Sequence, residues 1–389
     1  MLLTCSNKSG YLFFPHLLIS CSSLPFILCT LLTLTPVATL AEEKSLFELS
    51  LQQLADLEIT TASKVPERKD KTASTVSVIT AEEIRRSGAR NFLDVLSRVP
   101  GLSVGSGQYG EDFIAVRGLR TTWSEKVQLL LDGHLLNDVR SGSATYQFLD
   151  WLPLANIARI EVVKGPGSAL YGANAFLGVI NIITQRAEEI SGTQATVGGE
   201  FEAAGTVARR YNLLTGGQLT DDWQGSLNLN LLDAPGAELP VSPDALGRSG
   251  RADNHTKRFD VQGRLSHGPF SLHGRYLKRD AGGSFGPLYA LSNDSRQQVE
   301  YAFVDAEYRG QPAEFTELTV RAYLDHQDSD NYYVGLPAGT IPPASSYFPW
   351  NGTGLKGKTL AKENISGVET QLNYRGITDH TFHRPGLAP

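Results

Sequence analysis

Apolar and polar side chains alternate along several runs in the second half of the chain. Leu227, Leu229 and Leu231, for example, alternate with Asn228 and Asn230. The other runs cover residues 258–265, 302–309, 317–324 and 368–375. Because successive side chains of a β-strand point to opposite faces, each run predicts a strand with one apolar and one polar face. After residue 187 the chain has room for roughly eight strands of about 10 residues each.

The connections between these runs differ in length. His267-Gly-Pro269 is a short turn, whereas residues 233–256 and 326–363 are interpreted as long polar loops. A soluble sandwich shows the same alternation, so the alternation alone leaves both architectures open. Short turns at one rim and long loops at the other are typical of a transmembrane β-barrel. We therefore predict antiparallel transmembrane β-barrel strands over residues 188–389.

Residues 1–41 have a composition of their own. They contain one charged residue, Lys8, and all three cysteines of the chain, and the apolar run from Leu24 to Ala41 ends in small residues. This pattern predicts a secretory signal peptide at residues 1–41. A membrane-spanning helix and a lipoprotein site at Cys21 are the alternatives. The remaining chain has no cysteine, which excludes disulfides, thiolate zinc sites and iron–sulfur clusters there.

Residues 64–187 have the pattern of a compact α+β domain. Thr80 and Glu83 have capping-box spacing and Gly88 follows as a stop, so we expect a helix between them. A second short helix is expected to begin after Asn91 and to end before Pro100. Strands are expected at residues 75–79, 113–116, 127–131, 159–163 and 179–184.

One motif leaves an enzyme as an alternative. Gly105-Ser-Gly-Gln-Tyr-Gly110 matches G-x-G-x-x-G, and Asp132 follows at the distance of a ribose-binding acid, as in a secreted nucleotide-binding oxidoreductase. The last glycine of that fingerprint must open a helix, but here an acidic step leads into an apolar run at 113–116. His380 and His383 form the one close histidine pair, in an irregular tail. We expect no catalytic residues, no metal and no cofactor, and the net charge of −6 gives no reason to expect nucleic acid as a partner.

Six blocks of sequence, taken in order, resemble the plug domain of TonB-dependent outer-membrane receptors. They are residues 57–64, 76–84, 94–104, 114–119, 127–133 and 159–184. The resemblance implies an α+β plug domain followed by a barrel, in the cell outer membrane of a Gram-negative bacterium, and a monomer surrounded by outer-membrane lipid. It also implies energy-coupled uptake of a scarce nutrient through the periplasmic protein TonB. A ferric siderophore is the foremost cargo, with cobalamin or haem as alternatives, and a soluble periplasmic plug-like binding module is another alternative function.

The resemblance places a TonB box in the periplasmic N-terminal segment, residues 42–63. Its residues are Leu57, Glu58, Ile59, Thr60, Thr61 and Ala62. The β-branched residues of the box could add as an edge strand to TonB through main-chain hydrogen bonds. An ordinary linker strand is the alternative, and residues 64–71 are expected to be flexible.

The resemblance also implies outward-facing plug loops at residues 106–111, 120–125 and 137–146. Their side chains could offer stacking, hydrogen bonds and positive charge to an anionic ferric chelate. The candidate substrate-binding residues are Gln108, Tyr109, Arg120, Trp123, Arg140 and Tyr146. For each of them, an exposed loop residue without a binding role is the alternative.

The length of the chain does not fit a closed receptor. A plugged transporter needs about 22 strands, whereas residues 188–389 supply roughly eight. The last residues, 383–389, are proline-rich and do not alternate. We therefore expect an N-terminal fragment of a receptor, with a complete plug at 64–187 and an incomplete 22-stranded barrel after it.

Overall fold

The computed structural model describes a defined set of residues. They are 58–64, 67–68, 72, 74–106, 112–138, 140–145, 152–202, 205–236, 240–241, 243–244, 247–283, 291, 293–336, 338–339, 354–377 and 380–385. The expected signal peptide, residues 1–41, lies outside this set. Among the described residues, no helix combines the length and the apolar character needed to cross a membrane.

Two short helices form where their capping residues predict them. Helix α3, Ala81–Ser87, begins at a complete capping box: the Glu83 amide donates to Thr80 Oγ1 at 3.2 Å, and the Thr80 amide donates to Glu83 Oε2 at 2.7 Å. Gly88 ends the helix in the left-handed region, with φ 65°. Helix α4, Phe92–Leu96, has Asn91 as its N-cap and ends four residues before Pro100, earlier than we expected.

The plug contains a five-stranded sheet with the strand order β3-β8-β9-β6-β7. Its strands are β3 (Thr75–Thr80), β8 (Ile157–Lys164), β9 (Gly178–Thr184), β6 (Val127–Leu131) and β7 (His134–Leu135). The β6–β9 pair is parallel and the other pairs are antiparallel. Four of these strands confirm the sequence prediction, and β7 was not predicted.

Shorter elements complete the plug. A separate hairpin pairs β4 (Leu102–Ser106) with β5 (Asp112–Val116). The one-turn elements are α5 (Ser168–Tyr171), η3 (Leu154–Asn156), η4 (Ala173–Ala175) and η5 (Ala187–Glu189). Apolar residues of α3, α4 and the plug strands form one core, and Leu277, Val299, Tyr301 and Phe303 of the second sheet join it. The plug therefore packs against that sheet through shared core residues.

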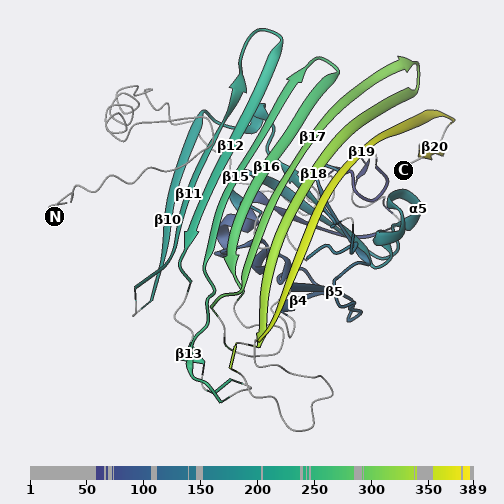
Figure 1. Ribbon diagram of the computed structural model, residues 1–389. Helices are drawn as coiled ribbons and strands as arrows, with labels where there is room; N and C mark the ends of the chain where they lie inside the picture. Colours follow the sequence, from purple (N-terminus) through teal and green to yellow (C-terminus); the bar gives the residue numbers. More distant parts are fainter. Residues whose placement is uncertain are drawn as a thin grey trace, which may run out of the picture. The chain divides into compact units, whose positions relative to one another are not determined.

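The second sheet has nine antiparallel strands in the order β10-β11-β12-β15-β16-β17-β18-β19-β20 (Figure 1). They are β10 (Thr193–Glu202), β11 (Gly205–Gln218), β12 (Trp223–Ala234), β15 (Thr256–His267), β16 (Phe270–Gly282), β17 (Arg296–Ala313), β18 (Thr316–Leu336), β19 (Leu355–Ile377) and β20 (His380–Pro385). We call this sheet the wall. A small hairpin of β13 (Pro240–Val241) and β14 (Gly250–Arg251) lies between β12 and β15 in the sequence. All five alternating runs are strands of the wall, as predicted.

One expected loop is wrong. Residues 326–363 were interpreted as one long loop, but β18 continues to Leu336 and β19 begins at Leu355. These extensions pair with each other, for example Gln327 with Glu363. Gln327, Ser329 and Asn331 are buried, so this part of β18 faces inward with polar residues. Because the outward residues here are polar as well, the sequence carries no alternation that would indicate a strand.

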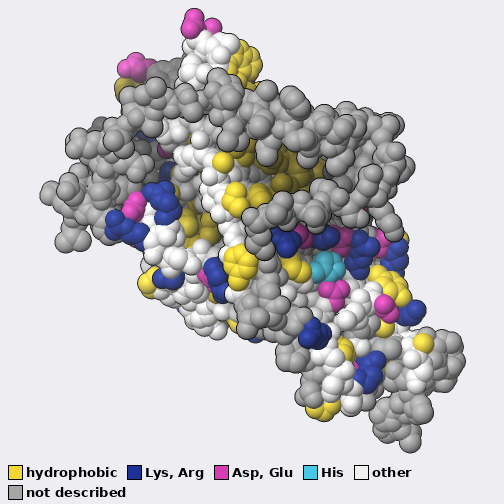
Figure 2. Space-filling model, turned by 90° about the vertical axis from the view of Figure 1, so that its left-hand side faces the viewer, with side chains coloured by type: hydrophobic (Ala, Val, Ile, Leu, Met, Phe, Trp, Pro, Cys, Tyr) yellow, Lys and Arg dark blue, Asp and Glu magenta, His cyan; other side chains and the backbone are white. Residues whose placement is uncertain are grey.

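The two faces of the wall have reversed polarity. Asn228, Asp260 and Gln262 are buried, whereas Leu227 and Leu265 on the opposite face are exposed. A soluble sandwich buries the apolar face of each sheet, so the burial pattern excludes that alternative for the wall. In Figure 2, hydrophobic side chains gather in the middle of the view and many charged side chains lie around them. An apolar outward face with a polar interior is the arrangement of transmembrane barrel strands.

Candidate functional site

The segment predicted to be the TonB box, which we call the box, packs against the plug. Strand β1 (Glu58–Ile59) pairs with β2 (Glu67–Arg68), and Ile59 and Thr61 have 0% and 1% of their surface exposed. This pairing corrects the expectation of a flexible stretch at residues 64–71 for the part of it that is described. Leu57, the first residue of the predicted box, lies outside the described residues.

A single carboxylate holds the docked segment. Glu161 Oε2 accepts hydrogen bonds from the amides of Thr60 (3.0 Å) and Thr61 (2.9 Å) and from Thr61 Oγ1 (2.6 Å). Its other oxygen accepts from Arg159 Nε at 2.8 Å. The Glu161 side chain is fully buried. Hydrogen bonds to an ionised acceptor are roughly twice as strong as neutral ones, so Glu161 is the main polar contact of the box.

Two further plug residues complete the cradle. Tyr171 donates its hydroxyl to the carbonyl of Thr61 at 3.0 Å, and Asn181 Nδ2 donates to Thr61 Oγ1 at 3.2 Å. Burial, together with the charge of Glu161, raises the pKa of Tyr171 above its ordinary value. Tyr171 therefore remains a protonated donor at all physiological pH values, and the contact does not depend on pH.

The segment after the box is attached to the wall. Lys64 forms an ion pair with Glu369 of β19, and the Lys64 carbonyl accepts from Gln371 Nε2 at 2.9 Å. The Lys64 ammonium also lies 5.0 Å from the centre of the Tyr171 ring. The plug thus holds the box, and Lys64, two residues after the box, contacts the wall.

The β6–β7 turn carries a second group of polar contacts. Asp132 and Gly133 adopt positive φ values of 50° and 82°, which the tight turn requires. Asp132 accepts from the Thr184 amide at 2.9 Å and forms an ion pair with Arg264 of β15 at 2.8 Å. Arg321 of β18 donates to the Asp132 carbonyl at 3.0 Å. Burial opposes ionisation of Asp132, but Arg264 and the other donors outweigh it and lower its pKa.

These contacts bear on the enzyme alternative. Asp132 is used in turn formation and in an ion pair with the wall, and Gly105 lies in β4, paired with Phe113 of β5. The next described element after the glycine motif is therefore an antiparallel strand. A dinucleotide fingerprint requires a helix at this point, so the motif gives no support for nucleotide binding.

His134 follows Gly133 in the sequence, and side chains of the wall enclose it. Its Nδ1 lies 3.0 Å from Asp305 Oδ1 and its Nε2 lies 3.0 Å from Asp325 Oδ1. The imidazole stacks on Phe303 with ring centres 4.0 Å apart, and only 2% of the side chain is exposed. Burial disfavours the charged imidazolium, but the two carboxylates outweigh it and raise the pKa of His134. The His134 cluster joins plug and wall through a buried imidazole between two acids.

Three of the six predicted cargo residues belong to the described part of the chain, and three do not. Trp123 and Arg140 lie on neighbouring loops, since Ser143 Oγ donates to the Trp123 carbonyl at 2.6 Å. Arg120 is exposed, and its guanidinium lies 4.1 Å from the centre of the Phe113 ring. The structure therefore brings two of the three predicted loops together. Gln108, Tyr109 and Tyr146 lie outside the described residues.

The box and these loops contact the wall at different heights. The box exit touches Glu369 and Gln371, which pair with Arg321 and Thr319 of β18. The loop residue Asp138 instead accepts from Gln327 of the same strand at 3.0 Å. Six to eight residues of strand separate these contacts, about 20–26 Å at 3.3 Å per residue. The box lies toward the short β17–β18 turn, and the loop that contains Asp138 lies toward the long connection between β18 and β19.

Sequence reasoning did not identify Glu161 or the partners of His134. Glu161 is the one acid within the otherwise apolar and basic strand Ile157–Lys164, and that isolated charge was the available signal. Asp305 and Asp325 gave none, because they occupy ordinary polar positions in alternating strands. Their role depends on the pairing of β17 with β18 and on the docking of the plug turn.

Comparison with known proteins identifies one domain by sequence. Residues 68–179 match the family model described as TonB-dependent Receptor Plug Domain. The chain is 34% identical over 172 residues to the vitamin B12 transporter BtuB of Vibrio vulnificus, covering 44% of this chain and 26% of that protein. It is 31% identical over 254 residues to the vitamin B12 transporter BtuB of Photobacterium profundum, covering 62% of this chain and 38% of that protein. The chain thus spans well under half the length of these relatives.

Solved structures share the fold. The ferric-catecholate import receptor Fiu from E. coli K12 covers 81% of this chain, with a TM-score of 0.57 and 20% identity. The siderophore receptor PiuA from Acinetobacter baumannii covers 85%, with a TM-score of 0.60 and 17% identity. This chain covers 48% and 46% of those two chains. At these identities the similarity concerns the fold alone.

Proposed function

Because this chain belongs to the TonB-dependent receptors, through its plug domain and the wall that packs against it, we propose that it serves energy-coupled uptake of a scarce nutrient across the outer membrane of a Gram-negative bacterium. In this proposal residues 1–41 are the signal peptide and residues 42–63 carry the TonB box. Residues 64–187 form the plug and residues 188–389 form part of a transmembrane barrel.

The docked box carries the proposal. Strand addition to TonB needs free main-chain donors and acceptors, and Glu161 and Tyr171 occupy those of Thr60 and Thr61 in this structure. Undocking the segment exposes both amides together, since one carboxylate holds them. The box would then be available to TonB at the short-turn end of the wall, which is the periplasmic rim of a barrel.

The foremost cargo in this proposal is a ferric siderophore. Arg120 and Arg140 are exposed on the plug loops and offer positive charge to an anionic chelate. Cobalamin is the second candidate, because curated relatives that match the chain include vitamin B12 transporters. Haem remains a further alternative without a supporting contact in the described residues.

Deletion of residues 57–62 tests the function. We expect uptake of the cargo to be lost while binding to intact cells is kept, because the deletion removes the contact with TonB and leaves the loops in place. Uptake of a radiolabelled ferric catecholate and of cyanocobalamin would be measured in cells that express the chain. Deletion of residues 45–50, six residues outside the box, is the matched control. Normal uptake after deletion of 57–62 would contradict the assignment.

A double substitution tests the cargo loops. Replacing Arg120 and Arg140 by alanine should weaken binding of the ferric catecholate by about tenfold, since each exposed charge contributes about 1 kcal/mol or less. Cyanocobalamin carries no comparable negative charge, and its binding should change little. Equilibrium binding to outer-membrane preparations measures both. Unchanged affinity for the ferric catecholate would remove these two residues from the site.

A further inference from the structure

A shallow trough crosses the outward face of the wall. Gly217, Gly225, Gly263 and Gly274 lie on four adjacent strands, with Gly217 paired to Gly225 and Gly263 paired to Gly274. The missing side chains leave open space at Gly217 and Gly263, whereas Leu219 and Leu265 lean over Gly225 between them. The hollow has a volume of about 560 Å³, within the range of cavities that hold small molecules.

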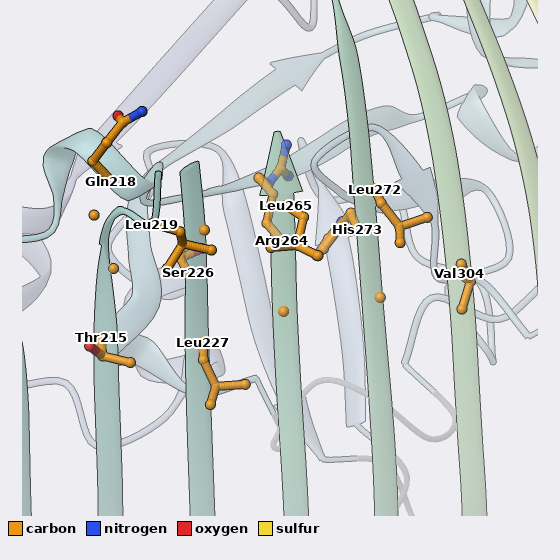
Figure 3. Close-up of a pocket in the computed structure, with 15 residues that line it drawn as sticks. Thr215, Gln218, Leu219, Ser226, Leu227, Arg264, Leu265, Leu272, His273 and Val304 are labelled. Atoms are coloured by element: carbon orange, nitrogen blue, oxygen red, sulfur yellow. The ribbon is translucent and has the colours of Figure 1, made fainter. Parts of the chain in front are cut away.

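The trough is lined by apolar side chains. Figure 3 shows Leu227, Leu265, Leu272 and Val304 around it, each from a different strand. These side chains are 39–47% exposed, and Leu219, which is 61% exposed, closes one end. Arg264 and His273 belong to the inward face, where they lie 2.8 and 3.9 Å from Asp132 of the plug. The outward surface of the trough is therefore mainly hydrocarbon, with Thr215 and Gln218 as polar residues of its lining.

An aromatic row fixes the position of the trough. Large aromatic side chains are exposed at the short-turn rim of the wall: Trp223, Phe270, Phe315 and Tyr374. Aromatic residues form such girdles where barrel strands leave the bilayer. Gly263 is four residues from His267, which pairs with both Trp223 and Phe270. This is about 13 Å along the strand, within one leaflet of a hydrocarbon core about 30 Å thick.

The turn beside the trough carries acidic side chains. Asp221 and Asp222 are exposed between β11 and β12, directly after Leu219 and Thr220. The Leu219 amide donates to the Trp223 carbonyl at 2.8 Å, so this turn is tight and its acids lie close to the end of the trough. Carboxylates at this position are complementary to an ammonium group and repel an anionic one.

We propose that the trough binds an acyl chain of an ammonium-bearing phospholipid in the leaflet at the short-turn rim, with the headgroup beside Asp221 and Asp222. This proposal rests on the proposed function, because it needs the wall to lie in a membrane. A flexible hydrocarbon chain can lie over Gly263 and Gly274 between the surrounding leucines, a space that an unbroken outward face of protruding side chains does not offer. The trough retains one lipid that the rest of the apolar face does not hold.

Filling the trough tests the proposal. A Cβ at Gly263 would meet no atom closer than 3.8 Å, so Gly263→Leu adds an outward apolar side chain without a clash. The full chain would be purified in mild detergent, incubated with vesicles of phosphatidylethanolamine or phosphatidylglycerol, and analysed by native mass spectrometry. We expect the wild type to retain one phosphatidylethanolamine and Gly263→Leu to retain at least tenfold less.

Two controls separate the possible outcomes. Ala322→Leu adds the same side chain at an exposed outward position outside the trough and should retain lipid like the wild type. Replacing Asp221 and Asp222 by asparagine should remove the preference for phosphatidylethanolamine. Equal retention by Gly263→Leu and wild type, or a second copy of the chain in place of lipid, would overturn the proposal. Failure of the proposed function would be seen separately, as absence of the wild-type chain from heat-modifiable outer-membrane protein.

Discussion

The plug and the wall follow opposite rules of burial. The plug buries Leu129, Leu131 and Ile180, as a soluble domain does, whereas the wall buries Asp260, Gln262 and Arg275 and exposes leucines of its outward face such as Leu227 and Leu265. The surface between the two regions therefore combines buried polar contacts with an apolar patch of four wall residues, Leu277, Val299, Tyr301 and Phe303, that join the core of the plug. The polar part of this contact is held by ion pairs and hydrogen bonds, which water can replace when the parts separate.

The substitution with the largest expected effect is one that breaks a buried ion pair within the wall. Arg275 donates to both oxygens of Asp260, at 3.0 and 2.6 Å, and both side chains are fully buried. Asp260→Ala leaves a buried guanidinium without its carboxylate, which costs about 3–5 kcal/mol. The midpoint of thermal or urea unfolding of the heat-modifiable form measures the loss.

An exposed ion pair in the same sheet is the control for that change. Asp330 pairs with Lys358 at 3.0 Å, and both side chains are about half exposed. Asp330→Ala should cost about 1 kcal/mol or less, because water screens the pair. Equal losses for the two variants would show that the polar face of the wall is hydrated and that its burial is not what stabilises it.

A smaller effect is expected where the box meets the plug. Glu161→Gln keeps the shape of the side chain but removes the charge that strengthens three hydrogen bonds. The loss is about 1–2 kcal/mol, or roughly a 5- to 30-fold rise in the undocked population. Residues after 41 contain no cysteine, so Ala62→Cys provides a single thiol there whose labelling rate reports undocking. Glu82→Gln on the surface of α3 is the control, and an unchanged labelling rate in Glu161→Gln would contradict the role of Glu161.

The smallest effect concerns pH and the contact between plug and wall. An undocked His134 has an ordinary pKa of about 6.5, and Asp305 and Asp325 raise it in the docked state against the opposing effect of burial. His134 therefore makes its full contribution to the contact between plug and wall below about pH 6.5. This contribution is lost as the pH rises through the pKa that His134 has in the docked state. Tyr301, Tyr323 and His273 also face the imidazole and belong to the same cluster.

Hydrogen exchange of the amides at residues 127–136 measures this dependence. After correction for intrinsic exchange, protection should fall severalfold between about pH 6 and pH 9 in the wild type. His134→Gln should remove the dependence, whereas His255→Gln, which alters a partly exposed histidine beside Asp253, should keep it. Protection that increases with pH would contradict the assigned sign.

Local signals predicted the plug well because each depends on a few neighbouring residues. Thr80, Glu83 and Gly88 define α3 through their own hydrogen bonds and backbone angles, and the apolar run 127–131 is β6 to the residue. The extension of β18 beyond residue 325 was missed, because residues 325–331 are polar on both faces. The docking of Thr60 and Thr61 was missed too, since their acceptor is about 100 residues away in the sequence.

The sequence by itself determined the class of protein: an α+β plug with the ordered blocks of its family, followed by strands with one apolar face. It could do so because capping, periodicity and turn chemistry act over a few residues. Only the tertiary structure decided which face of the wall is buried, that Glu161 holds the box, and that His134 lies between Asp305 and Asp325. These contacts join residues that are between 100 and about 190 positions apart, and a pattern of neighbouring residues cannot specify such pairs.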